Sequence, residues 1–262
     1  MKSALDLFKL DGKVAMVTGG SKGIGMFYSE ALADAGAYVA VADIDRKTVA
    51  ETTERLNRKH PDSILGIQMD VSSRDSIREA VKKIDQRWGR LDILVNNAAL
   101  FAVIQSRDTP WSIPDEEFDR VMAVNVRGIY SCTAEALALM QRNHWGRVIN
   151  IASGLAFKGS ARLMHYAASK GAVVTLTRSM AMDLGDKGIT VNALAPGGTS
   201  SPTFVEIHGE NAMRAKAMIN SRCIKREELP EDLVGTMLYL ASSASDFLTG
   251  QTIVVNGGDY LH

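Results

Sequence analysis

Apolar residues follow two patterns along the chain. Seven short runs are rich in β-branched and other apolar residues and are bounded by turn-forming residues, which is typical of buried strands. They cover residues 13–18, 38–43, 64–70, 91–96, 147–152, 189–195 and 251–256. Between most of them, apolar residues return at the spacing of an amphipathic helix. This alternation predicts parallel βαβ units, and therefore a doubly wound α/β fold with a seven-stranded parallel sheet flanked by helices on both faces.

The same pattern indicates one domain. Residues 1–262 contain no internal repeat, low-complexity tract or Pro/Gly-rich linker that would mark a boundary. Residues 197–230 differ from the rest because they open with Gly, Ser and Pro and then turn helical. We expect a substrate lid at about 199–221. The predicted helices 115–142 and 164–185 are apolar around much of their surface, which favours contact with a partner subunit.

Charge and composition exclude several classes of function. Thirty basic and thirty acidic residues cancel, so the chain lacks the net positive charge that binds nucleic acid or an anionic membrane. No apolar run reaches the ~18 residues of a membrane span, and residues 1–13 lack a signal-peptide pattern. The two cysteines and five histidines are not spaced as metal ligands. We therefore expect a cytoplasmic protein with no metal, no nucleic-acid partner and no membrane contact.

The first predicted strand runs into TGGSKGIG (residues 18–25), and a helix follows at once. Gly19, Gly23 and Gly25 would let the backbone turn tightly and approach a ligand, while the helix N-terminus faces an anion. The spacing differs from GxGxxG, but Asp43 ends the second strand, where a carboxylate can accept hydrogen bonds from an adenosine ribose. This context predicts a Rossmann-type dinucleotide site. The alternative is a helix N-terminus with structural glycines and a surface acid.

Two charges bear on the choice of dinucleotide. The carboxylate of Asp43 would repel the 2′-phosphate of NADP, whereas it can accept a hydrogen bond from the free hydroxyl of NAD. Lys22 lies in the glycine turn and could instead meet that phosphate. Because the like charge of Asp43 should dominate, we expect NAD as the cofactor, with NADP as the alternative.

Two further strand ends carry polar groups. Asp70 ends the third strand, where a short acid can accept a hydrogen bond from the adenine amino group. NNAA (96–99) ends the fourth strand with two amides and two small residues, which suits close contact with a cofactor. Asn96 and Asn97 could instead only cap the strand.

The segment HYAASKGAV places Tyr166 four residues before Lys170, so the two share a helix face. A phenol, of ordinary pKa about 10, exchanges protons near neutral pH only if that pKa falls. An adjacent ammonium and a positively charged nicotinamide would lower it. Ser153 lies just past the fifth strand and can hydrogen-bond a substrate oxygen. These groups suit hydride transfer between an alcohol carbon and nicotinamide, and the alternative is a Tyr–Lys pair on a helix surface.

TGGSKGIG, NNAA, Asn125, Ser153 and YAASK, in this order, resemble the short-chain dehydrogenase/reductase family in its single-domain branch. The resemblance implies an NAD(P)-dependent dehydrogenase/reductase that acts on CH–OH groups. It also implies that Tyr166 is the acid/base, that Lys170 bonds the nicotinamide ribose and that Ser153 bonds the substrate. Asn125 resembles the family residue that holds a water in a relay to the lysine. Members commonly form tetramers, so a homotetramer is expected.

The expected binding residues form two sets. Those for the cofactor are Gly19, Ser21, Lys22, Gly23, Ile24, Gly25, Asp43, Asp70, Val71, Asn97, Ala98, Tyr166, Lys170, Pro196, Gly197, Thr199 and Ser201. Those for the substrate are Ser153, Leu155, Phe157, Leu163, His165, Tyr166 and Phe204. PGGTSS (196–201) resembles the family loop that contacts the nicotinamide carboxamide. Ala99 and Asn256 depart from the family pattern, in which glycine and aspartate are common.

The favoured function is NAD-dependent hydride transfer to or from a small or medium secondary alcohol or its ketone. Two alternatives stay open. One is an NADPH-dependent 3-oxoacyl reductase acting on acyl-carrier-protein or CoA thioesters. The other is a non-catalytic NAD(H)-binding sensor built on the same fold.

Overall fold

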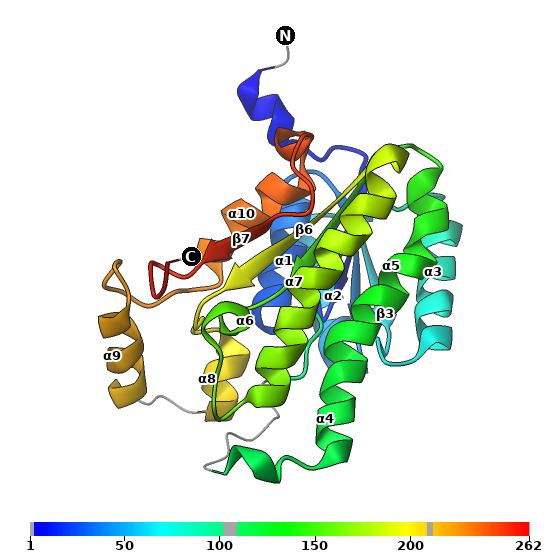
Figure 1. Ribbon diagram of the computed structural model, residues 1–262. Helices are drawn as coiled ribbons and strands as arrows, with labels where there is room; N and C mark the ends of the chain where they lie inside the picture. Colours follow the sequence, from blue (N-terminus) through cyan, green and yellow to red (C-terminus); the bar gives the residue numbers. More distant parts are fainter. Residues whose placement is uncertain (1–2, 102–108, 209–211, 262) are drawn as a thin grey trace.

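The computed structural model describes residues 3–101, 109–208 and 212–261. One sheet contains the seven strands β1 (Val14–Thr18), β2 (Tyr38–Asp43), β3 (Ile64–Gln68), β4 (Ile93–Asn96), β5 (Gly146–Ile151), β6 (Ile189–Pro196) and β7 (Thr252–Val255). Their order is β3-β2-β1-β4-β5-β6-β7, and every neighbouring pair is parallel. Helices cover both faces of this sheet (Figure 1). The predicted fold class is confirmed.

The strand order reverses beside β1. The chain adds β2 and β3 on one side of β1 and then returns to add β4 to β7 on the other. β1 therefore pairs with two strands, Val14 with Tyr38 of β2 and Ala15 with Ile93 of β4. All residues of β1 are buried, as expected for a parallel strand covered on both faces. In such sheets a ligand binds at the carboxyl ends of the strands where the order reverses.

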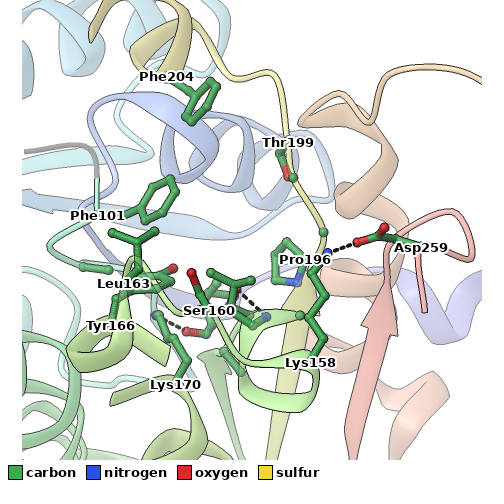
Figure 2. A pocket seen from close by; sticks show the side chains of 18 of the residues that line it. Phe101, Lys158, Ser160, Leu163, Tyr166, Lys170, Pro196, Thr199, Phe204 and Asp259 are labelled. Carbon is green, nitrogen blue, oxygen red and sulfur yellow. Dashed lines mark hydrogen bonds and ion pairs between the residues drawn. The ribbon is translucent and has the colours of Figure 1, made fainter. Parts of the chain in front are cut away.

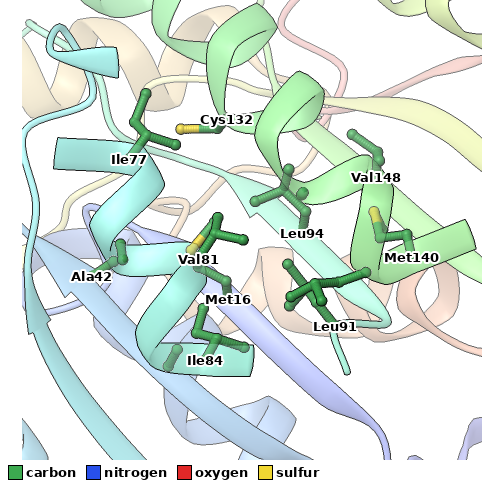
Figure 3. Packing of buried hydrophobic residues seen from close by; sticks show 14 of the residues in the cluster. Met16, Ala42, Ile77, Val81, Ile84, Leu91, Leu94, Cys132, Met140 and Val148 are labelled. Carbon is green, nitrogen blue, oxygen red and sulfur yellow. The ribbon is translucent and has the colours of Figure 1, made fainter. Parts of the chain in front are cut away.

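Alternate strand residues pack under helices on opposite faces. On one face Met16 belongs to a core that includes residues of α3 (Arg74–Trp88), α5 (Gly128–Gln141) and α7 (Met164–Leu184). Figure 3 shows part of this core, where Ile84 and Met140 lie close to strand residues. On the other face Ala15 and Val17 pack with residues of α1 (Gly23–Asp34), α2 (Arg46–Lys59) and α10 (Glu231–Ala241).

The other elements are short. They are η1 (Ala4–Phe8), η2 (Pro110–Ser112), α4 (Asp115–Met122), η3 (Ala123–Arg127), α6 (Leu155–Lys158), η4 (Gly185–Lys187), α8 (Pro202–His208), α9 (Ala212–Ser221) and η5 (Ser243–Ser245). The predicted lid thus contains two helices, α8 and α9. No helix among the described residues is long and apolar enough to cross a membrane. Nor do three or more His, Cys, Asp or Glu side chains within these ranges group as metal ligands.

The predicted helix 115–142 forms one helical run, and a π turn in its middle divides it into two α-helices. α4 ends at Met122, α5 begins at Gly128, and η3 between them is a π-helical turn. Such turns are rare and are frequently found at functional sites. Asn125 lies in this turn with its side chain fully buried. Its Oδ1 accepts a hydrogen bond of 2.8 Å from the Leu100 amide, so the turn holds the amide side chain against the segment after β4.

Candidate active site

A cavity of about 690 Å³ lies at the carboxyl ends of the central strands (Figure 2). This volume lies in the range typical of small-molecule sites. It brings together predicted residues from distant parts of the chain. Those that line it are Ile24, Asn97, Ser153, Leu155, Leu163, Tyr166, Lys170, Pro196, Gly197, Thr199, Ser201 and Phe204.

The glycine turn between β1 and α1 is fixed by close backbone contacts. Gly19 and Gly23 have φ angles of 60° and 54°, which favour glycine. A Cβ atom on Gly25 would lie 2.0 Å from the carbonyl oxygen of Gly19, so a side chain does not fit there. The side-chain amide of Asn97 donates to the carbonyl oxygens of Thr18 and Gly19, each at 3.0 Å. The turn therefore leaves a narrow cradle at the N-terminus of α1 that fits a pyrophosphate.

Asp43 ends β2 beside this turn and is 5% exposed. Its Oδ2 accepts a hydrogen bond from the Ser21 hydroxyl at 2.8 Å and one from the Ser21 amide at 3.3 Å. From the described residues, its Oδ1 accepts only a long bond of 3.4 Å, from the Asp45 amide. The carboxylate is thereby held in place, and Oδ1 keeps the capacity to accept a bond from a ribose hydroxyl.

Lys22 pairs with an acid at the start of α2. Its side chain is 48% exposed, and its Nζ lies 3.6 Å from Oδ2 of Asp45. The same carboxylate caps α2 by accepting bonds from the amides of Lys47 and Thr48. Asp45 is therefore held rigidly and offsets part of the Lys22 charge beside Asp43.

Two predicted cofactor residues, Asp70 and Ala98, make contacts that support the backbone. Oδ1 of Asp70 accepts bonds from the amide and the hydroxyl of Ser72, at 2.8 and 2.7 Å, which fixes the turn after β3. Val71 is buried. The Ala98 amide donates to the Thr18 hydroxyl at 3.0 Å. The contact between Asp70 and adenine stays a prediction.

Tyr166 and Lys170 share one face of α7, and the lysine is almost fully buried. Its Nζ donates a hydrogen bond of 2.6 Å to the carbonyl oxygen of Ile151 at the end of β5. Nζ lies 5.7 Å from the centre of the Tyr166 ring. Burial lowers the pKa of the Lys170 amine to about 7, because a charge is costly to desolvate.

The pKa of the Tyr166 phenol differs from the expectation. Burial raises it above its ordinary value, while a hydrogen bond with the Ser153 hydroxyl acts in the opposite direction. A lowered pKa was expected from the Lys170 ammonium and a nicotinamide charge. Desolvation dominates the pKa of Tyr166. The burial that raises this pKa also disfavours the charged form of Lys170, whose ammonium would otherwise lower it.

Asn125 connects two elements of the site. Besides accepting a bond from Leu100, its amide donates to the Ser169 hydroxyl at 3.0 Å. That hydroxyl in turn donates to the carbonyl oxygen of Tyr166 at 2.7 Å. Asn125 therefore links the segment after β4 to the first turns of α7, and its predicted role in a water relay stays a prediction.

Two predicted substrate residues point elsewhere. His165 is fully buried, and its Nε2 faces the Glu117 carboxylate on α4 at 3.0 Å. Phe157 stacks against Tyr260, with ring centres 6.0 Å apart, and neither residue belongs to the cavity lining. His165 points away from the cavity because adjacent residues of a helix project about 100° apart, and its neighbour Tyr166 faces the cavity. Proximity in sequence to Tyr166 was therefore a misleading signal.

Four other lining residues were not among the expected binding residues, although Met218 and Ser221 lie within the predicted lid. Met218, Ser221 and Arg222 come from the end of α9 and the segment after it, and Asp259 comes from the C-terminal tail. Asp259 pairs with Lys158 of α6 across the cavity wall, as Figure 2 shows. No motif or spacing marks these residues, because they reach the cavity only through the tertiary packing of distant segments.

Comparisons with known proteins agree with this geometry. Residues 19–259 match the family model described as "Enoyl-(Acyl carrier protein) reductase". The chain is 35% identical to sorbitol dehydrogenase of Cereibacter sphaeroides, over 97% of this chain and 99% of that one. It is 33% identical to galactitol 2-dehydrogenase of Agrobacterium fabrum, with the same coverage. The structure of a gluconate 5-dehydrogenase from Burkholderia cenocepacia, in complex with NADP and tartrate, has a TM-score of 0.90 at 32% identity, covering 98% of each chain.

The glycine cradle gives a direct prediction. Gly25→Ala would place a methyl group against the carbonyl oxygen of Gly19, and the turn must then shift. Overpacking of this kind costs about 1–3 kcal/mol, so we expect NADH to bind roughly 10- to 100-fold more weakly. NADH fluorescence titration measures this. Gly235→Ala, in open space on α10, is the control and should bind NADH like the unmodified protein. Equal affinity in both variants would contradict the assignment of the cradle.

Proposed function

The chain belongs to the short-chain dehydrogenase/reductase family, and from this premise we propose that it transfers a hydride between NAD and a secondary hydroxyl group of a polyol. It is an NAD(P)-dependent oxidoreductase acting on CH–OH groups. The observation that carries the proposal is the convergence of Ser153, Tyr166 and Lys170 on one cavity beside the glycine cradle. These three side chains are suited to proton transfer. A non-catalytic sensor would not need them together, so their convergence disfavours that alternative.

The chain supplies the proton chemistry, and the bound nicotinamide supplies the hydride acceptor or donor. The Ser153 hydroxyl orients the substrate oxygen beside the phenol of Tyr166, which takes or returns the hydroxyl proton. Because the pKa of Lys170 is about 7, its amine and ammonium forms are both populated near neutral pH. Lys170 can therefore accept and return a proton, and in its charged form it stabilises a phenolate at Tyr166.

Preference for NAD rests on the charges around the glycine turn. Asp43 is buried at the end of β2, where a 2′-phosphate would meet a like charge. Asp45 offsets Lys22, the cation that could otherwise attract this phosphate. Two acids against one half-exposed cation favour the cofactor that lacks the extra phosphate.

A hydroxyl-bearing substrate suits the cavity lining. Near Tyr166 the wall is apolar, and the ring of Phe101 lies 4.8 Å from the ring of Tyr166. Farther away the lining contains hydroxyl groups and the Lys158–Asp259 ion pair. These groups can donate hydrogen bonds to the hydroxyl groups of a substrate and accept hydrogen bonds from them. Similarity to the sorbitol and galactitol dehydrogenases supports a polyol, with α8 and α9 as the lid. The second candidate, an NADPH-dependent 3-oxoacyl reductase, is favoured by 35% identity to the 3-oxoacyl-[acyl-carrier-protein] reductase of Staphylococcus aureus, over 95% of this chain and 98% of that one. The description of the matching family model also names a reductase of acyl-carrier-protein substrates.

Tyr166→Phe tests the catalytic assignment. The variant keeps the ring but loses the group that exchanges the proton, and general acid–base catalysis is worth on the order of 10²–10⁴ in rate. We expect kcat for D-sorbitol oxidation to fall by that factor while NADH binds within twofold of the unmodified protein. Tyr130→Phe, on the exposed side of α5, is the matched control and should keep full activity. A Tyr166→Phe protein that retains turnover would contradict the role assigned to the phenol.

Cofactor choice is tested by Asp43→Ser. Removal of the carboxylate relieves the repulsion of a 2′-phosphate and also loses a hydrogen-bond acceptor for the ribose. We expect the ratio of kcat/KM for NADP to that for NAD to rise by roughly tenfold or more, a change of about 1.4 kcal/mol in relative barrier. Asp45→Asn, which frees Lys22 but keeps Asp43, should shift the ratio less. A larger shift for Asp45→Asn would show that Lys22 decides the selectivity.

We also propose a homotetramer. Both α5 and α7 carry many apolar residues, and some of these face outward: Tyr130 on α5 is 51% exposed and Met182 on α7 is 89% exposed. Exposed apolar side chains on adjacent long helices are typical of a subunit interface. The last strand and the C-terminal tail would make the second contact.

Light scattering of the purified protein tests this proposal. We expect a mass about four times the 28.4 kDa of one chain. Tyr130→Glu together with Met182→Lys should reduce that mass, because charges would enter an apolar interface. A mass of one chain for the unmodified protein would refute the tetramer.

A further inference from the structure

The loop from Gly197 to Ser201 follows β6 and lines the cavity. It begins with two glycines, which alone would leave its backbone free to take several conformations. At its start, the Gly197 amide donates to the Val255 carbonyl oxygen on β7 at 2.8 Å. The sheet ends at that residue, so sheet hydrogen bonds do not fix the rest of the loop. Its conformation therefore depends on side chains from other parts of the chain.

Glu228 binds this loop at two points. Its Oε1 accepts a hydrogen bond of 2.7 Å from the Thr199 hydroxyl. Its backbone carbonyl oxygen accepts one of 2.8 Å from the Ser200 amide, and Thr199 and Glu228 form an isolated parallel bridge. Glu228 is 5% exposed. A charged side chain buried to this extent is found almost only where it makes specific polar contacts.

Arg222 binds the same loop from the lid side. It directly follows α9, is 3% exposed, and donates from one terminal nitrogen to the Gly198 carbonyl oxygen. Its other terminal nitrogen donates to the Arg226 carbonyl oxygen at 3.0 Å. A Cβ atom on Gly198 would lie 2.1 Å from the Met218 methyl group, so the end of α9 packs directly on the loop.

The two side chains carry opposite charges and act on each other. Burial raises the pKa of the Glu228 carboxyl, while the Thr199 hydroxyl and the Arg222 charge oppose that rise. Within the described residues, Oε2 of Glu228 and Nε of Arg222 are buried with no hydrogen-bond partner. Burying charged side chains whose polar atoms lack partners is costly. Stability alone therefore does not account for these two side chains, which points to a role in function.

We propose, on the basis of the function proposed above, that Glu228 and Arg222 are positioning residues for the nicotinamide end of the cofactor. Together they fix the Gly197–Ser201 loop in one conformation and join it to the end of α9. The cofactor then binds to a loop that is already ordered, and no binding energy is spent on ordering it. The glycine cradle and Asp43 serve the other end of the dinucleotide. Within the described residues, the side chains of Glu228 and Arg222 make no hydrogen bond to either of them.

The test compares two ligands that share an adenine end. NADH has the nicotinamide, and ADP-ribose lacks it. In Glu228→Ala we expect the dissociation constant for NADH to rise about tenfold, as expected for loss of one hydrogen bond to a charged group, and that for ADP-ribose to stay within twofold. Calorimetry measures both constants. Glu227→Ala, one residue away, is the matched control and should leave both unchanged.

If Glu228→Ala does not fold, Thr199 provides the second route. Thr199→Val removes the hydroxyl that bonds Glu228, whereas Thr199→Ser keeps it. We expect weaker NADH binding in the first variant and rescue in the second, with ADP-ribose unaffected in both. A parallel loss of affinity for NADH and ADP-ribose, or no change for either, would overturn the proposal. Failure of the polyol assignment is distinguishable, because NADH would then bind normally to the unmodified protein without polyol turnover.

Discussion

The site depends on one junction, where the carboxyl ends of β1 and β4 are bonded to each other. The Thr18 hydroxyl accepts bonds from the amides of Asn97 and Ala98, and the Asn97 side chain returns two bonds to the turn after β1. These contacts satisfy backbone groups that the end of the sheet would leave unpaired. They also fix the turn in a shape that only glycine permits at Gly25. The cradle, the start of α1 and one wall of the cavity all follow from this junction.

Burial controls the chemistry on the other side of the cavity. Lys170 reaches through the packed interior to the Ile151 carbonyl oxygen, and desolvation brings its pKa to about 7. The same desolvation raises the pKa of the Tyr166 phenol. The chain alone therefore holds the phenol protonated, ready to act as an acid, and a cationic cofactor would shift the balance toward the base. In the mechanism proposed above, the charge of the bound cofactor therefore decides whether the phenol acts as the acid or as the base.

The fold and the central residues of the site could be predicted from sequence because their signals are local. Strands show as short apolar runs, and Tyr166 and Lys170 show as an i, i+4 pair. The π turn around Asn125 could not be predicted, since one extra residue in a turn hardly changes the apolar period. His165 and Phe157 were misplaced because their side chains pack on Glu117 and Tyr260, which lie far away in sequence. Arg222, Glu228 and Asp259 have no local signal at all.

The most direct test of the account is a calorimetric titration of the unmodified protein with NADH and, separately, with NADPH. We expect one site per chain and tighter binding of NADH, because Asp43 ends β2 beside a cradle for the pyrophosphate. Tighter binding of NADPH would contradict the assignment of Asp43 and make Lys22 the deciding charge. Binding of neither nucleotide would contradict the central claim, that the junction of β1 and β4 builds a dinucleotide site.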